Sequence, residues 1–237
     1  MRILYSNTGI NYYIGIKGIL MDSRMKCYCI SLVENSKERD VCQREFDKIG
    51  LEVEFEIVER SPEGGSYGCF MSHLEVLNKG LKTNSEYIMI MEDDVYFYHT
   101  DSTIFDKIYK FMDSIRKDEY VRLELDKLKW CLCLGYFTNS HSISVNKHIV
   151  ALDKCYCSHA YIVPRHTAEK LAQMEWKNLP YDIEWHNVID LFYAPYPMIA
   201  FQRSHVSTVS SGLGSYMINI IGFQNIARIC ELRTWIP

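Results

Sequence analysis

The sequence predicts an α/β fold with a mixed, mostly parallel sheet and helices on both of its faces. Apolar runs of strand length alternate with amphipathic helical patterns through the first half of the chain. One of these runs, residues 87–91, leads directly into three consecutive carboxylates, Glu92, Asp93 and Asp94. Ligands of open α/β sheets bind at the carboxyl ends of strands, so this junction is the first candidate functional site.

Composition narrows the class of protein. The chain has 237 residues, enough for one large domain, and its 48% apolar and 24% charged residues are typical of a soluble globular protein. A net charge of -4 without a basic cluster argues against a nucleic-acid partner. No apolar stretch reaches the length of a membrane span, and residues 1–20 lack the continuous apolar core of a signal peptide. We therefore expect a cytoplasmic protein.

Nine cysteines are present, and six of them form Cys-x-Cys pairs: Cys27/Cys29, Cys131/Cys133 and Cys155/Cys157. Residues two apart on a strand share one face of the sheet. The pairs are compatible with a thiolate metal site or with disulfides. The Cys-x₂-Cys spacing of zinc sites is absent, so we favour free thiols that fill strand faces as small apolar residues.

The first predicted elements are a strand, a helix and a second strand. Residues 27–33 have the apolar pattern of a buried strand. Asn35 and Glu38 form a capping-box pattern for the helix that follows, and Gly50 ends that helix. Alternating apolar and glutamate residues over 51–57 predict a half-exposed strand.

Three glycines between residues 64 and 68 separate this strand from the next predicted helix. Ser72 and Glu75 form a second capping-box pattern, which predicts a helix from Ser72 to about Leu81. This assignment places Ser72 and His73 in the first helical turn. The strand that ends at Glu92 follows.

The remaining elements are predicted from the same patterns. The 3.6-residue periodicity of residues 104–115 predicts a helix. Residues 130–134 and 159–163 read as strands, residues 167–174 as a helix, and residues 2–6 as an extra strand at the start of the chain.

The acidic cluster has the chemistry of a divalent-cation site. Mn²⁺ or Mg²⁺ takes oxygen ligands and is often bound together with a phosphate-bearing substrate. Adjacent residues of an extended chain cannot all face one ion, so we assign Glu92 and Asp94 to the metal and expect Asp93 to point to the opposite face. The alternative interpretation is a solvated acidic turn.

A set of short motifs runs in order along residues 27–210. The motifs are residues 29–32 with 38–39, 68–73, 91–95, 130–135, 158–163 with 168–171, 180–182, and Pro197 with Gln202 and residues 207–209. In this order they resemble glycosyltransferase family 25, which includes lipooligosaccharide glycosyltransferases and collagen hydroxylysine galactosyltransferase domains. Two positions depart from the family pattern: Ser31 stands where asparagine is usual, and residues 62–64 replace an aspartate-glycine pair.

The resemblance implies a GT-A-type nucleotide-sugar-binding fold in a single domain, residues 1–237. Residues 1–135 would bind the nucleotide sugar, and residues 136–237 would form the acceptor side. It also implies inverting, metal-dependent transfer of a hexose from a UDP-sugar. The acceptor would be a hydroxyl group of a glycan or of hydroxylysine in a collagen-like protein.

Inverting transfer needs a general base within hydrogen-bond reach of the acceptor hydroxyl. Asp182 and Glu184 are the candidates, and Asp182 is similar to the late aspartate of the family. If the segment is extended, both carboxylates share one face. If it begins a helix, Asp182 caps the helix and Glu184 projects from its first turn.

Other side chains are assigned on the same resemblance. Arg39, Ser72 and His73, together with Asp93, are the predicted donor-binding residues. His205 is the predicted further metal ligand, and His159 is a second histidine considered for the site.

Two other functions were weighed against a transferase. A non-catalytic sugar- or nucleotide-binding protein would keep the fold, but the complete acidic motif and Asp182 argue against it. A metal-dependent phosphohydrolase would need a two-metal cluster, and the sequence shows no second set of ligands with histidine spacing.

Overall fold

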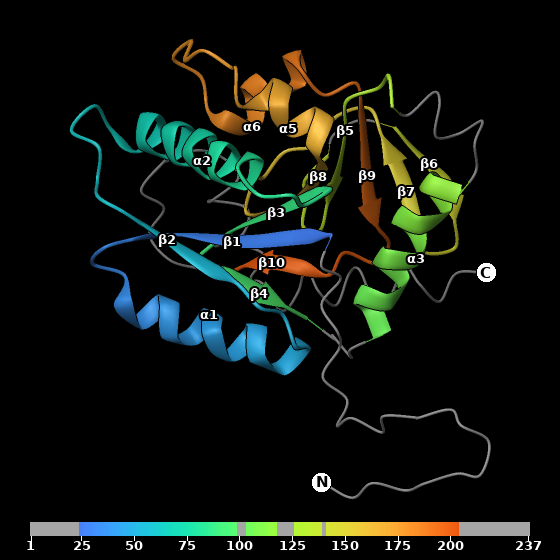
Figure 1. Ribbon diagram of the computed structural model, residues 1–237, viewed down its shortest axis with the longest axis horizontal. Helices are drawn as coiled ribbons and strands as arrows, with labels where there is room; N and C mark the ends of the chain where they lie inside the picture. The colour runs from blue at the N-terminus through green and yellow to red at the C-terminus, as the bar shows by residue number, and fades with distance from the viewer. Residues whose placement is uncertain (1–23, 99–102, 118–125, 139–140, 204–237) are drawn as a thin grey trace, which may run out of the picture.

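The computed structural model describes residues 24–98, 103–117, 126–138 and 141–203 (Figure 1). The predicted strand at residues 2–6 and His205 lie outside the described residues. The main sheet has eight strands: β1 (Met25–Leu32), β2 (Glu54–Val58), β3 (Tyr87–Glu92), β5 (Trp130–Cys133), β6 (Ser142–Asn146), β7 (Ile149–Leu152), β8 (Ala160–Pro164) and β9 (Leu191–Pro195). A second, two-stranded sheet pairs β4 (Val95–Phe97) with β10 (Ala200–Gln202).

The main sheet is mixed, with strand order β2-β1-β3-β8-β5-β9-β7-β6. Neighbours run parallel in β2-β1-β3 and in β5-β9 and antiparallel at the other pairings. Strands from both sides of residue 135 share this sheet, since β8 lies between β3 and β5. The assignment of a donor half and an acceptor half stays a prediction.

The helices are α1 (Ser36–Ile49), α2 (Gly65–Leu81), α3 (Thr103–Lys117), α5 (Arg165–Leu171) and α6 (Tyr181–Glu184), and a 3₁₀ turn (Trp185–Asn187) follows α6. Among the described residues, no helix combines the length and the apolar character that crossing a bilayer requires.

Helices cover both faces of the sheet, as predicted (Figure 1). Side chains alternate along each strand, so each face has its own core. Cys27, Met89 and Met91 belong to the core that includes residues of α1 and α3. Tyr28 and Ile90 belong to the core that includes residues of α2, α5 and α6. The predicted α/β, GT-A-type class agrees with this arrangement.

The carboxyl ends of β1 and β3 meet at one edge of the sheet because the two strands are parallel. Ile30 lies opposite Glu92 in the register of this pair. β8 runs antiparallel to β3 and begins at the same edge, with Ala160 opposite Met91. The backbone N–H of Glu92 donates to the carbonyl of His159 at 3.0 Å. The acidic motif and the segment before β8 are therefore neighbours.

Helix α1 forms where it was predicted, and Gly50 ends it in the left-handed conformation, with φ 67°. The predicted capping box at its start is wrong. Asn35 is the N-cap residue, but its side chain makes no cap hydrogen bond. The Asn35 amide instead donates to Asp93 Oδ2 at 3.0 Å. A tertiary contact with the acidic motif replaces the local one.

Helix α2 begins at Gly65, seven residues before the predicted start at Ser72. Ser72 therefore lies inside the helix, where its hydroxyl donates to the Gly68 carbonyl one turn earlier at 2.7 Å. The glycines were expected to form a loop, but Gly68 lies in the helix, where it packs closely against Ser61. A Cβ on Gly68 would lie 3.1 Å from Ser61 Cβ.

All eight cysteines of the described residues are free thiols. The Cys27/Cys29 and Cys131/Cys133 pairs lie on β1 and β5, and each pair faces one core, as expected. The third pair departs from the prediction because it precedes β8 in a loop. Cys157 there has φ 78°, a left-handed conformation that is uncommon for a residue other than glycine.

Candidate active site

Glu92 ends β3 with its side chain turned toward the segment before β8 and toward α2. The Ser158 hydroxyl donates to Glu92 Oε1 at 3.0 Å, and His73 Nε2 lies 3.5 Å from the same oxygen. Burial alone would raise the pKa of Glu92. The contacts with His73, His159 and Ser158 outweigh burial and lower this pKa, so the carboxylate is ionised at neutral pH.

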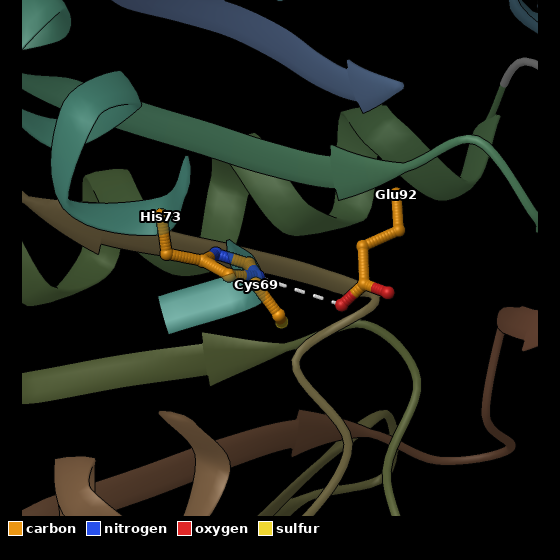
Figure 2. A group of neighbouring side chains, drawn as sticks. All are labelled: Cys69, His73 and Glu92. Atoms are coloured by element: carbon orange, nitrogen blue, oxygen red, sulfur yellow. Dashed lines mark ion pairs between the residues drawn. The ribbon is translucent and has the colours of Figure 1, made fainter. Parts of the chain in front are cut away.

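His73 is fully buried in α2 and is held from two directions. Its ring stacks on the Tyr181 ring, with centroids 4.3 Å apart and planes 8° apart. Its Nδ1 is hydrogen-bonded to the Tyr161 hydroxyl at 3.0 Å, and this hydroxyl bonds to that of Tyr181 at 3.0 Å. Nε2 has no hydrogen-bond partner among the described residues and points toward Glu92 (Figure 2).

Cys69 lies one helical turn before His73 and joins the same cluster. One ligand atom from each of Cys69, His73 and Glu92 lies within 4.8 Å of the others (Figure 2). Burial, followed by the charges of Glu92, Asp182 and Asp94, raises the pKa of the Cys69 thiol. Cys69 was not among the predicted site residues. Its signal was the Cys-x₃-His spacing, which places both side chains on one face of a helix.

Asp93 turns to the side of β1, away from Glu92. The Ser31 hydroxyl donates to Asp93 Oδ2 at 2.6 Å. Arg39 donates to this hydroxyl at 2.9 Å and also to the carbonyls of Leu32 and Val33. Asp93 and Arg39 therefore belong to one network at the end of β1. Their contacts with a donor stay predictions.

Asp94 is buried next to the last described strand. The Gln202 amide donates to Asp94 Oδ2 at 3.2 Å, and the backbone N–H of Arg203 donates to the Asp94 carbonyl at 2.8 Å. Burial, followed by the charges of Glu92 and Asp93, raises the pKa of Asp94 well above its usual value. The sequence analysis did not assign Gln202 to the site.

Asp182 lies in α6, a single helical turn, so the extended alternative for this segment is wrong. Pro180 is the N-cap residue of α6, and Asp182 does not cap it. Asp182 Oδ2 instead accepts the backbone N–H of Cys157 at 2.9 Å. Burial raises the pKa of Asp182, the Cys157 N–H opposes this effect, and the charge of Glu92 adds to it. The side chain is half-buried.

Glu184 has a different environment from Asp182. It is only 3% exposed, and its Oε2 accepts the Asn187 amide at 3.2 Å. Residues two apart on a helix do not face the same direction. Of the two candidate bases, Asp182 is the more accessible.

The two remaining candidates among the described residues are enclosed. Ser72 is buried and uses its hydroxyl on Gly68. His159 is buried with Nε2 3.5 Å from the Ala200 carbonyl, and burial lowers its pKa. Gly135 makes room for this ring, since a Cβ there would lie 2.2 Å from His159 Nε2. The predicted ligand His205 lies outside the described residues.

Carboxylates that are far apart in the sequence share one neighbourhood. Asp182 Oδ2 accepts the backbone N–H of Cys157 at 2.9 Å, and the hydroxyl of the next residue, Ser158, donates to Glu92 Oε1 at 3.0 Å. The acidic motif at the end of β3 and the late aspartate of α6 therefore converge at the carboxyl edge of the sheet.

A family model described as "Glycosyltransferase family 25 (LPS biosynthesis protein)" matches residues 63–185, more than half of the chain. This chain belongs to glycosyltransferase family 25. The matched range contains Cys69, His73, the acidic motif and Asp182. The family 25 protein is therefore a glycosyltransferase, an enzyme that requires a sugar donor and an acceptor.

Two solved structures are distantly similar to this family 25 glycosyltransferase. The A197 protein from STIV matches with a TM-score of 0.42 and 12% identity, covering 78% of this chain and 98% of its own. A glycosyltransferase involved in the glycosylation of the major capsid of PBCV-1 matches with a TM-score of 0.38 and 13% identity, covering 67% of this chain and 74% of its own. No curated protein matches by sequence.

Proposed function

We propose that this family 25 glycosyltransferase transfers a hexose from a UDP-sugar, with inversion, to a hydroxyl group of a glycan or of hydroxylysine in a collagen-like protein. The supporting observation is that Asp182 lies beside the acidic motif at the carboxyl edge of the sheet, since the adjacent residues Cys157 and Ser158 bind Asp182 and Glu92. Metal-dependent inverting transfer needs a cation-binding group at the leaving diphosphate and a base at the acceptor. This edge supplies carboxylates for both.

The donor set fits Mn²⁺ or Mg²⁺. Glu92 and Asp94 offer the carboxylate oxygens that these ions prefer. Burial, followed by the charges of Glu92 and Asp93, raises the pKa of Asp94, and a cation held there would relieve the charge repulsion. When bound, the ion supplies Lewis-acid neutralisation of the charge that develops on the leaving diphosphate. Asp93, held by Ser31 and Asn35, is positioned for the ribose or the donor sugar.

Asp182 is the proposed general base. The Cys157 N–H holds Oδ2 of the carboxylate, and the side chain is only half-buried, so an acceptor can reach it. Its raised pKa brings the carboxylate closer to the pH range in which a base is most effective. Asp182 would take the proton of the acceptor hydroxyl as the hydroxyl oxygen attacks the anomeric carbon from the face opposite the leaving group.

The proposal is tested by product analysis with a panel of UDP-hexoses, with glycan and hydroxylysine-peptide acceptors, and with Mn²⁺ or chelator. We expect an inverted glycoside only when donor, acceptor and cation are all present. Hydrolysis of the donor at the same rate without an acceptor would instead indicate a phosphohydrolase. A bound donor that gives no product with any acceptor would indicate a binding protein.

A further inference from the structure

We propose that Cys69, His73 and Glu92 form a binding site for a zinc-type ion, which shares Glu92 with the oxygen ligands proposed for the donor cation. The three residues come from one turn of α2 and from the end of β3 (Figure 2). They offer a thiolate, an imidazole and a carboxylate. These are the three ligand types that Zn²⁺ takes in proteins.

The ligand atoms are close to the separations that a tetrahedral ion requires. Bond lengths of about 2.0–2.3 Å place neighbouring ligand atoms of zinc about 3.3–3.6 Å apart. His73 Nε2 and Glu92 Oε1 are already 3.5 Å apart. All three ligand atoms lie within 4.8 Å of one another. The three atoms would have to close by no more than about 1.5 Å to reach the separations of a zinc site.

His73 is prepared as a ligand by its surroundings. Its ring is completely buried, yet Nε2 has no hydrogen-bond partner among the described residues. An unpaired buried nitrogen costs free energy unless something binds it. The Tyr161 hydroxyl holds Nδ1, and the Tyr181 ring fixes the plane of the imidazole. Metal-bound histidines are usually held through their second ring nitrogen in this way.

The rest of the cluster completes the site. The Ser158 hydroxyl orients Glu92 through Oε1. The Glu92 side chain is 25% exposed, which leaves an entry path from the edge of the sheet. Three protein ligands leave one position of a tetrahedral ion open, a pattern found in catalytic rather than structural zinc sites.

The ligand chemistry separates this site from the one proposed for the donor. Thiolate and imidazole favour Zn²⁺ or Co²⁺, whereas Mn²⁺ and Mg²⁺ favour carboxylates and water. Glu92 is common to both ligand sets. An ion on Cys69 and His73 would hold Glu92 on the α2 side, away from Asp94.

The test uses Co²⁺ as a spectroscopic probe of the full-length protein, with no sugar nucleotide present. A thiolate ligand gives a sulfur-to-cobalt charge-transfer band in the near ultraviolet. We expect this band in the wild-type protein at one equivalent of Co²⁺, and we expect Zn²⁺ to remove it while Mn²⁺ does not. Cys69→Ser should abolish the band. Ser158→Ala keeps all three ligands and should weaken zinc affinity by about 10–100-fold.

Matched variants identify the ligands. Cys157→Ser changes the other half-buried cysteine, and Asp94→Asn changes the acidic motif; both should retain the band, with folding checked by circular dichroism. Absence of the band in the wild-type protein would overturn the proposal. So would its loss in Cys157→Ser or Asp94→Asn while Cys69→Ser retains it. Because no donor is used, these outcomes are independent of the transfer reaction.

Discussion

The imidazole of His73 lies parallel to the ring of Tyr181, with 4.3 Å between the ring centroids. This contact joins α2 to α6. His73 also faces Glu92, and Tyr181 directly precedes Asp182. The stacked pair therefore holds the acidic motif of the donor side next to the proposed base.

The stack can be separated into its ring contact and its hydroxyl contact. Tyr181→Phe keeps the ring and removes the hydrogen bond to the Tyr161 hydroxyl, which should cost about 0.5–1.5 kcal/mol of stability. Tyr181→Leu also removes the aromatic contact, which adds about 0.5–1.5 kcal/mol beyond the lost area. Urea denaturation measures both losses. Transfer should persist in Tyr181→Phe and fall in Tyr181→Leu; equal transfer rates would show that the stack does not position Asp182.

Cation dependence should depend on Asp94. Asp94→Asn keeps the size of the side chain and removes its charge, so donor binding that requires Mn²⁺ should be lost while the fold is retained. Calorimetric titration of the donor, with Mn²⁺ and with chelator, measures this dependence. If chelator leaves the donor affinity of the wild-type protein unchanged, the proposed metal role of Glu92 and Asp94 is wrong.

Asp94→Asn should also raise the stability of the protein when no cation is bound. Burial and neighbouring carboxylates raise the folded-state pKa of Asp94. The folded state therefore holds this proton more tightly, and stability falls as the pH rises from the unfolded-state pKa through the raised one. In chelator at neutral pH, Asp94→Asn should unfold at a higher urea concentration than the wild-type protein. Below the ordinary pKa of aspartate the difference should disappear.

Asp190 supplies a control, because replacing it by asparagine should change stability in the opposite direction from Asp94→Asn. Burial would raise the pKa of Asp190. The contact with Lys129 at 2.9 Å outweighs burial and lowers this pKa. The stabilisation from this ion pair is fully present above the unfolded-state pKa of aspartate. It is lost as the pH falls through the lowered folded-state pKa. Asp190→Asn should therefore destabilise the protein at neutral pH, by about 0–1 kcal/mol because the pair is exposed. A lower urea midpoint for Asp94→Asn as well would contradict the assigned electrostatics.

The core cysteines should resist alkylation in the native protein. Burial raises the pKa of Cys27 to about 12, and Cys131 is also buried with a raised pKa. The thiolate is the reactive form, so neither residue should react with iodoacetamide at pH 8 until the protein unfolds. Mass spectrometry before and after denaturation counts the modified thiols. Stable disulfides in fresh, non-reduced protein would argue against the proposed cytoplasmic location.

The sequence predicted the elements whose patterns are long or strongly apolar. Strand β3 and its acidic end were predicted because a buried apolar run followed by three carboxylates has few alternative structures. The start of α2 was misjudged because Gly65 and Gly68 resemble a loop when their packing against the chain is unknown. The short strands β6 and β7 gave too little periodicity to be recognised.

The site was predictable only in part, because its geometry comes from tertiary contacts. Cys69 was given no role in the site, because only the position of α2 at the end of β3 brings it to Glu92. The choice between Asp182 and Glu184 stayed open because one helical turn has no periodicity. The Cys157 N–H, offered from a loop with positive φ, binds the Asp182 carboxylate, a contact that no sequence pattern predicts.

The role of Asp182 gives the most direct test of the whole account. Asp182→Asn keeps the shape of the side chain but removes the base, which should lower the single-turnover rate of transfer by about 10²–10⁴-fold. Donor binding in Mn²⁺ should be unchanged, because the proposed cation ligands are untouched. Glu184→Gln is the matched control and should lose less, since Glu184 is enclosed in the core.

The decisive measurement is therefore the single-turnover transfer rate of Asp182→Asn with saturating donor and Mn²⁺. The account predicts a loss of about 10²–10⁴-fold with donor affinity retained. A near-wild-type rate for Asp182→Asn, whether or not Glu184→Gln is impaired, would contradict it.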